Sequence, residues 1–237
     1  MLSLDAPIVA VVWQDFVARC YPSPLLPQGR WVLGLTVWAI YLADRLVDVR
    51  HPASAAESTR HGFYRRYNTA ARLLLGAVVL TDVLVSLLWL RPAVFSNGVL
   101  LGTAVLCYLA VFAGWRFGGV AWKQPSAALL FTVGVFLIAW TVTANPWRDL
   151  TFPAAAFAAL CLGNLRLVEG ESAGWIPMLL LAAGCLIGAA FSGSNWLYAI
   201  AMSAVGLSAV DLFSDRLSRD ARGVLADAVL LAPLLFR

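Results

Sequence analysis

The sequence W-A-I-Y-L-A-D-R-L-V-D, residues 38–48, ends a hydrophobic run that begins near Trp31 and carries two carboxylates at its end. Asp44 and Asp48 are four residues apart, so they share one face if this stretch is a helix. Two carboxylates at the mouth of a hydrophobic helix are suited to a divalent cation that holds a phosphate-bearing substrate. This stretch therefore predicts both a membrane helix and a candidate site at its end.

The composition indicates an integral membrane protein. Of the 237 residues, 61% are hydrophobic and only 13% are charged, and the mean hydropathy is +0.80. A soluble domain of this length carries about 25% charged residues. The low charge and the ten tryptophans predict that most of the chain lies in a bilayer. The net charge of +4 is best explained by membrane topology, so no nucleic-acid partner is predicted.

Hydrophobic runs separated by proline, glycine and polar clusters predict about nine transmembrane helices in a single domain, residues 1–237. The expected helices are 6–20, 31–48, 70–90, 97–115, 126–143, 152–168, 174–191, 196–213 and 223–236. An Arg-rich loop is expected over 49–69, and a basic loop over 116–125 ends in Lys123-Gln124-Pro125. Asn145-Pro146 is expected to be a turn. The predicted fold class is an all-α, polytopic membrane bundle.

The basic residues predict the orientation of this bundle. Twelve of the seventeen Lys and Arg residues lie in or directly beside the loops that follow the second, fourth, sixth and eighth predicted helices. Cytoplasmic loops are enriched in Lys and Arg, so these loops are expected on the cytoplasmic side. The N-terminus is then cytoplasmic and the C-terminus external, in a membrane of the bacterial inner-membrane type.

The remaining polar residues gather on the same predicted side. Lys123 follows the fourth helix, and Asn164 and Glu169 end the sixth. The first cytoplasmic loop contributes Arg60, Tyr64, Arg65 and Arg66. Carboxylates that hold Mg²⁺, with Arg and Lys to neutralise the remaining charge, are the parts of a diphosphate site.

Four further carboxylates lie outside this predicted diphosphate site. Asp211 and Asp215 are expected to form a solvated helix end. Asp82 and Asp227 lie inside predicted spans, where an ionisable residue is a functional candidate by default. The alternative for each is a neutral side chain or pairing with Ser or Thr on a neighbouring helix.

These features resemble the UbiA superfamily of intramembrane prenyltransferases. Residues 38–48 resemble the family's first Asp-rich motif, N-D-x-x-D-x-x-x-D, with Ala43 in place of the Asn. Lys123-Gln124-Pro125 and the small-residue helix through Gly134 resemble the segment after the family's fourth helix. Asn164 and Glu169 stand where the second motif, D-x-x-x-D, has two Asp residues. The architectural resemblance covers nearly the whole chain.

The resemblance implies an enzyme that transfers or cyclises the prenyl group of a Mg²⁺-bound isoprenyl diphosphate. Asp44, Asp48 and Glu169 would bind Mg²⁺, and Asp44, Asp48 and Lys123 would be catalytic. Substrate would contact Arg60, Tyr64, Arg65, Arg66, Asn164 and Glu169. The implied partners are the diphosphate, an unknown acceptor and membrane lipid.

Two alternatives to a prenyltransferase remain. Intramembrane Asp residues on Gly- and Ala-rich helices also suit a small transporter. The replaced Asp residues at Asn164 and Glu169 favour a non-catalytic relative that binds an isoprenoid lipid. Mg²⁺-dependent release of pyrophosphate would distinguish the enzyme from both.

Overall fold

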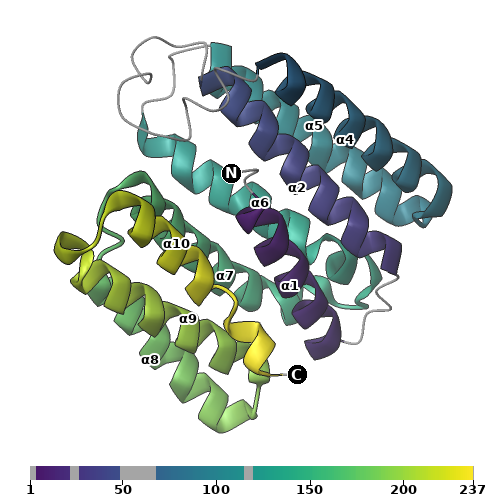
Figure 1. Cartoon of the computed structure of the whole chain (residues 1–237). Helices are drawn as coiled ribbons and strands as arrows, with labels where there is room; N and C mark the ends of the chain where they lie inside the picture. Colours follow the sequence, from purple (N-terminus) through teal and green to yellow (C-terminus); the bar gives the residue numbers. More distant parts are fainter. Residues whose placement is uncertain (1–3, 22–26, 49–67, 115–119, 237) are drawn as a thin grey trace. The chain divides into compact units, whose positions relative to one another are not determined.

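The computed structural model describes residues 4–21, 27–48, 68–114 and 120–236, and the regular elements in these ranges are all helical (Figure 1). The chain divides into two compact units, which are described separately. Unit 1 comprises Met1–Val11 and Leu26–Gly119. Unit 2 comprises Val12–Leu25 and Val120–Arg237.

Unit 1 is built on a pair of long helices. It contains the first turns of α1 (Asp5–Cys20), then α2 (Pro27–Asp48), α4 (Asn68–Trp89) and α5 (Pro92–Gly114). Leu42 and Leu46, late in α2, pack against Ala71 and Val78 of α4. Thr36, earlier in α2, contacts Asp82, which lies later in α4. The two helices therefore run in opposite directions along a shared apolar seam.

Unit 2 contains the second part of α1 and five further α-helices: α6 (Val120–Val142), α7 (Pro146–Glu169), α8 (Trp175–Ser192), α9 (Asn195–Leu212) and α10 (Arg219–Val229). Helix α7 contacts α6, α9 and α10, and α8 packs along α9. Short 3-10 turns, η2 (Ser214–Arg216) and η3 (Ala232–Leu235), precede and follow α10. The α10–η3 segment runs beside α9, with Ser203 of α9 donating to the Val229 carbonyl at 3.3 Å.

An aromatic cluster fills the core of unit 2. Trp13, from the second part of α1, lies 4.7 Å from the Phe157 ring and 5.1 Å from the Trp196 ring. Both tryptophans are fully buried, and the Trp13 indole Nε1 donates to the Leu230 carbonyl at 2.8 Å. Close ring packing with a satisfied indole donor stabilises the cluster. It fixes α1, α7 and α9 around the chain that follows α10.

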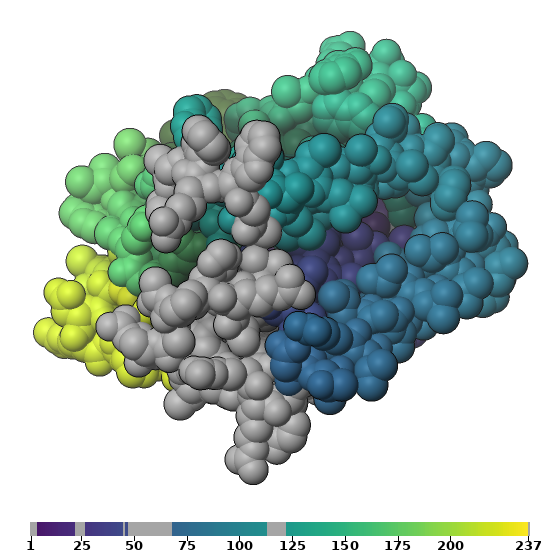
Figure 2. Space-filling view, turned by 90° about the horizontal axis from the view of Figure 1, so that it is seen from above, coloured from purple at the N-terminus to yellow at the C-terminus, as the bar shows by residue number. Residues whose placement is uncertain are grey.

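Six described helices, α4 to α9, are long and apolar enough to cross a membrane. Most residues of α4 and α5 are at least partly exposed, many of them large and hydrophobic, and Figure 2 shows part of this surface in blue. Leu80 and Leu88 of α4 and Leu100 of α5 are more than half exposed. Such surface is stable against lipid but not against water. The chain is therefore an all-helical integral membrane protein.

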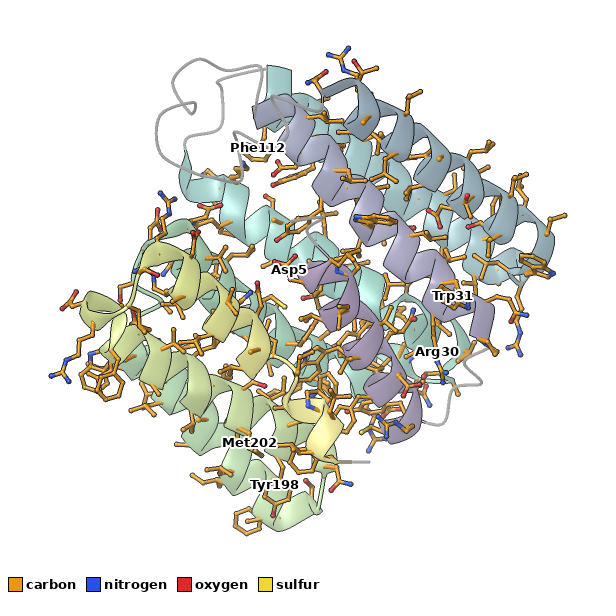
Figure 3. All side chains as sticks on the ribbon, viewed as in Figure 1. Asp5, Arg30, Trp31, Phe112, Tyr198 and Met202 are labelled. Carbon is orange, nitrogen blue, oxygen red and sulfur yellow. The ribbon has the colours of Figure 1, made fainter. Side chains whose placement is uncertain are left out.

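Exposed tryptophans lie at the ends of these helices. Arg30 and Trp31 are at the start of α2, with Trp31 exposed (Figure 3). The other exposed tryptophans at helix ends are Trp89 on α4, Trp122 on α6, Trp147 on α7 and Trp175 on α8. Tryptophan prefers the boundary between lipid tails and head groups, so this placement fits helices that begin and end at that boundary.

The nine expected helices each overlap an α-helix of the described residues, but several boundaries were wrong. Lys123-Gln124-Pro125 was expected in a loop and instead lies inside α6, because a proline removes only one donor and membrane helices tolerate it. Asn145-Pro146 was expected as a turn, yet Pro146 is the first residue of α7. Proline suits that position because its missing N–H would be unpaired there anyway.

Three of the nine expected spans, the first, second and ninth, are not among the six described helices that are long and apolar enough to cross a membrane. They correspond to α1, α2 and α10, of which α1 has only 16 residues and α10 only 11. The expected helix over 223–236 is α10 followed by η3, which together still extend beside α9.

Gly206 allows α10 to approach α9 closely, and its replacement by Ala will destabilise the protein. An added Cβ would lie 2.5 Å from Val229 Cγ1 and 2.9 Å from Cγ2. Overpacking of this kind costs about 1–3 kcal/mol, so we expect G206A to lower the apparent Tm in detergent by several degrees.

Two further variants control this prediction. V229A in the G206A background should recover most of the loss, because it removes both clashing methyl groups. Gly184→Ala on α8 meets nothing within 4 Å and should be neutral or slightly stabilising. Equal effects of G206A and G184A would contradict the close α9–α10 packing.

Candidate functional site

The acidic pair identified in the sequence lies in the last two turns of α2, in unit 1. Asp44 is partly buried and has an interaction partner, and Asp48 is the final residue of the helix. Both positions therefore lie on one helical face, as their spacing predicted. The side chains of Arg45 and Asp48 lie outside the described part of the structure.

Asp82 has a hydrogen-bond partner on a neighbouring helix of unit 1. Thr36 Oγ1 of α2 donates to Asp82 Oδ2 of α4 at 2.7 Å. This is the Thr pairing that the sequence left open for an Asp inside a span. A hydroxyl–carboxyl hydrogen bond between membrane helices is an ordinary packing interaction, and it accounts for Asp82 Oδ2. Asp82 Oδ1 is buried without a hydrogen-bond partner among the described residues.

Two carboxylates meet one amide in unit 2. Gln124, in the first part of α6, is only 5% exposed. Its Nε2 donates to Glu169 Oε2 at 2.6 Å and to Glu171 Oε2 at 3.2 Å. The amide therefore holds the carboxylates at the end of α7 close together, despite their like charge. Lys123 precedes Gln124 in the same turn, is partly buried and has an interaction partner.

Two arginines of α10 converge on the end of α7. The helix closes at Gly170 with φ +95°, a left-handed conformation that glycine adopts without strain. A Cβ added there would lie 3.1 Å from Arg222 Nη2 and 3.7 Å from Arg219 Nε. Arg219 Nη2 donates to the Glu169 carbonyl at 3.0 Å, whereas Arg222 Nε is buried without a partner among the described residues.

Arg219 and Arg222 were among the basic residues that predict the orientation, and no site was expected for them. Arg219 and Arg222 are three residues apart, and positions at that spacing share a helix face. The spacing could have predicted that the two arginines lie side by side on one helix. Their approach to Gly170 could not be predicted, because it depends on the packing of α10 against α7.

Asp211 was expected to be solvated, and the structure corrects this. Asp211 is 6% exposed, and its Oδ2 accepts a hydrogen bond from Ser172 Oγ at 2.9 Å. Ser172 follows the end of α7 by three residues and also accepts from the Gly174 N–H at 3.1 Å. Asp215 is exposed, as expected.

Asn164 and Asp227 form a second polar contact in unit 2. Asn164 of α7 is 8% exposed, and its Nδ2 donates to Asp227 Oδ1 of α10 at 3.1 Å. One partner of Asp227 is thus the amide of Asn164. Asn164 lies five residues before Glu169, about 7.5 Å along the helix axis.

The predicted site residues therefore fall into three sets. Lys123, Asn164 and Glu169 belong to unit 2, where Glu169 is joined to the α6 turn that carries Lys123. Asp44 and Asp48 belong to unit 1. Arg60, Tyr64, Arg65 and Arg66 lie outside the described residues. Within the described ranges, no group of three or more His, Cys, Asp or Glu side chains is placed to hold a metal.

Replacing Gln124 by Glu will turn the amide bridge into a cluster of three carboxylates. The change removes the donor to Glu169 and Glu171 and adds a buried like charge, so we expect a lower apparent Tm without divalent cations. Mg²⁺ should restore part of the loss, because it neutralises the cluster. Thermal unfolding with and without Mg²⁺ measures this.

Gln124→Met is the matched control for this prediction. It removes the donor without adding charge, so it should lower the Tm with no recovery in Mg²⁺. A Q124E protein that gains no stability from Mg²⁺ would show that these carboxylates do not gather a cation.

Comparison of the chain with known protein families, curated proteins and solved structures finds no match.

Proposed function

We propose that the chain is a UbiA-like intramembrane prenyltransferase, which uses a Mg²⁺-bound isoprenyl diphosphate and transfers or cyclises its prenyl group. The observation that supports this most is the polar end of unit 2. There, two carboxylates share the Gln124 amide, and two guanidinium groups converge on Gly170 directly after Glu169.

Two converging guanidinium groups favour an anionic ligand. Arg219 and Arg222 carry like charges close to one point, and their mutual repulsion is relieved by an anion that both contact. Guanidinium groups bind phosphate through paired, charge-assisted hydrogen bonds. The buried Nε of Arg222 has no hydrogen-bond partner among the described residues, so it is a donor available for such a contact. The proposal also assigns substrate binding to Arg60, Tyr64, Arg65 and Arg66.

The neighbouring carboxylates suit Mg²⁺. Magnesium prefers hard oxygen ligands and commonly binds through one or two carboxylates together with substrate phosphates. Glu169 is exposed, and its Oε2 is engaged by Gln124, so the group is positioned and accessible. Asp44 and Asp48 of α2, in unit 1, are the other metal-binding residues of the proposal. When bound, Mg²⁺ would neutralise the diphosphate and make it a better leaving group.

The chain's own residues would then hold the diphosphate and exclude water. Lys123, Arg219 and Arg222 would stabilise the negative charge that grows on the diphosphate as the allylic carbon–oxygen bond breaks. The apolar helices of the bundle would surround the prenyl chain and shield the allylic cation from water until the acceptor captures it.

The test is Mg²⁺-dependent release of pyrophosphate from farnesyl diphosphate by the full chain in lipid nanodiscs. We expect release in Mg²⁺ and none in EDTA or in empty nanodiscs. Binding of farnesyl diphosphate without release would identify a non-catalytic lipid-binding protein, and no binding at all would refute the proposal.

A further inference from the structure

The contact between Asp82 and Thr36 in unit 1 leaves one carboxyl oxygen unexplained. Thr36 Oγ1 donates to Asp82 Oδ2 at 2.7 Å, whereas Asp82 Oδ1 is buried and has no hydrogen-bond partner among the described residues. Most buried polar atoms in folded proteins are paired, so an unpaired carboxyl oxygen calls for a physical explanation.

The contact lies at a depth where the membrane is hydrocarbon. Because α2 and α4 run in opposite directions, the exposed Trp31 at the start of α2 and the exposed Trp89 at the end of α4 mark the same lipid boundary. Thr36 follows Trp31 by five residues and Asp82 precedes Trp89 by seven. The two side chains therefore start about 7.5 Å and about 10.5 Å from that boundary, within a hydrocarbon layer about 30 Å thick.

Thr36 is used differently from two other threonines of unit 1. Thr81 of α4 and Thr103 of α5 each donate to the carbonyl four residues earlier in their own helix, at 2.8 and 2.9 Å. Thr36 instead donates across the seam to the neighbouring helix. Its hydroxyl is therefore committed to the Asp82 carboxyl group.

The charges around Asp82 favour a neutral carboxyl group. The basic residues closest to the contact along the chain are Arg30, six residues before Thr36, and Arg91, nine residues after Asp82. These separations correspond to about 9 Å and about 13.5 Å along the helix axes. An ionised carboxylate at this depth would have a single hydrogen-bond donor and no close cation, and a group in that position takes up a proton instead.

The remaining ionisable groups of unit 1 do not change this balance. The carboxylate closest to Thr36 on α2 is Asp44, eight residues later and about 12 Å along the axis. The other ionisable residues in the described ranges of unit 1 are Asp5 on α1, Tyr41, Arg45 and Asp48 on α2, Arg72 on α4, and Cys107 and Tyr108 on α5.

A proton is the ligand that fits the unpaired oxygen. Asp82 Oδ1 is buried, so water or a metal ion could reach it only if neighbouring side chains moved. One carboxylate and one hydroxyl also offer too few oxygen ligands for a cation such as Mg²⁺. A proton on Oδ1 needs no such space, and it leaves Oδ2 as the carbonyl oxygen that accepts from Thr36, as observed.

We propose that Asp82 is a proton-binding site within the membrane, with the proton on Oδ1 and with Oδ2 held by the Thr36 hydroxyl. The proton comes from water and converts the carboxylate to a carboxyl group, with no other reactant. Its binding keeps the seam between α2 and α4 free of charge. This inference is independent of the proposed function, because it involves neither a diphosphate nor Mg²⁺.

Infrared difference spectroscopy across a pH titration tests the site in the full chain in nanodiscs. At neutral pH we expect a C=O band of a protonated carboxyl group that is absent in Asp82→Asn and present in Asp215→Asn, which changes an exposed carboxylate. In Thr36→Val the band should move to higher frequency, because the C=O group loses its hydrogen bond. Thr36→Ser keeps the hydroxyl and should leave the band in place.

Three spectroscopic results would overturn the proposal. The first is the absence of a band that depends on Asp82 at any pH at which the protein is folded. The second is an equal band position in the wild type and T36V. The third is loss of the band when Na⁺ replaces choline at constant pH, which would make the site a cation site.

Thermal unfolding provides a second measurement. In D82N the amide keeps an acceptor for the Thr36 hydroxyl and carries no charge, so its apparent Tm at neutral pH should match that of the wild type. Folding takes up a proton at Asp82, so raising the pH from about 7 to about 10 should lower the Tm of the wild type more than that of D82N. Equal losses in the two proteins would contradict a proton held at Asp82.

Discussion

Replacing Asp44, Asp48 or Glu169 by the matching amide should lower Mg²⁺-dependent pyrophosphate release by about two to three orders of magnitude. The amide keeps the size of the side chain but removes the charge that binds a cation, so loss of activity would report on the metal and not on the fold. The measurement is the initial rate of pyrophosphate release from farnesyl diphosphate at saturating Mg²⁺. Each variant should keep the wild-type Tm to within a few degrees, because Glu169 is exposed and Asp48 ends its helix.

Asp215→Asn is the matched control, because Asp215 is an exposed carboxylate beyond the end of α9. It should retain full activity. A second readout is the Mg²⁺ concentration for half-maximal rate, which should rise in any variant that retains measurable turnover. Full activity in D44N and D48N would remove these residues from the metal role. Full activity in E169Q alone would limit that role to the α2 carboxylates.

The sequence was sufficient for the fold class because hydrophobic runs mark membrane helices strongly. All nine expected helices overlap observed ones, but three of them begin five or six residues earlier in the structure than expected, at Pro92, Val120 and Pro146. Proline was interpreted as a helix break. It is instead favoured at the first position of a helix, as at Pro92 and Pro146, and Pro125 lies inside α6. The distinction depends on which side of the proline the helix lies, and hydropathy alone does not determine that.

Part of the candidate site was also predictable. Glu169 and the turn that carries Lys123 were expected at one end of the bundle from the alternation of loop charges, and they meet there through Gln124. The partners could not be predicted in the same way. Gln124 is uncharged and was placed in a loop, and its two contacts depend on how α6 packs against α7. The spacing of residues in the sequence predicts which of them share a face of one helix. It does not predict which faces of two helices pack together.

Removing the charge of Arg222 or Arg219 should weaken Mg²⁺-dependent pyrophosphate binding by about ten- to a hundredfold each. A charge-assisted hydrogen bond to phosphate contributes about 1.5–3 kcal/mol, and each R→Q variant removes at least one. The larger effect is expected for Arg222, whose buried Nε has no competing partner, whereas Arg219 also donates to the Glu169 carbonyl. Isothermal titration with pyrophosphate and Mg²⁺ measures the affinity directly.

Arg216→Gln is the matched control for this pair. Arg216 is exposed and lies over the Phe213 ring, with its Cζ 5.8 Å from the ring centroid. All three variants remove one positive charge from the same end of unit 2, so a general loss of surface potential would weaken binding equally in each. A local site instead predicts a loss in R219Q and R222Q only, and a weaker salt dependence in those two variants. Equal affinities in all three would reduce these arginines to topology signals and leave the diphosphate to the Arg60, Arg65 and Arg66 loop.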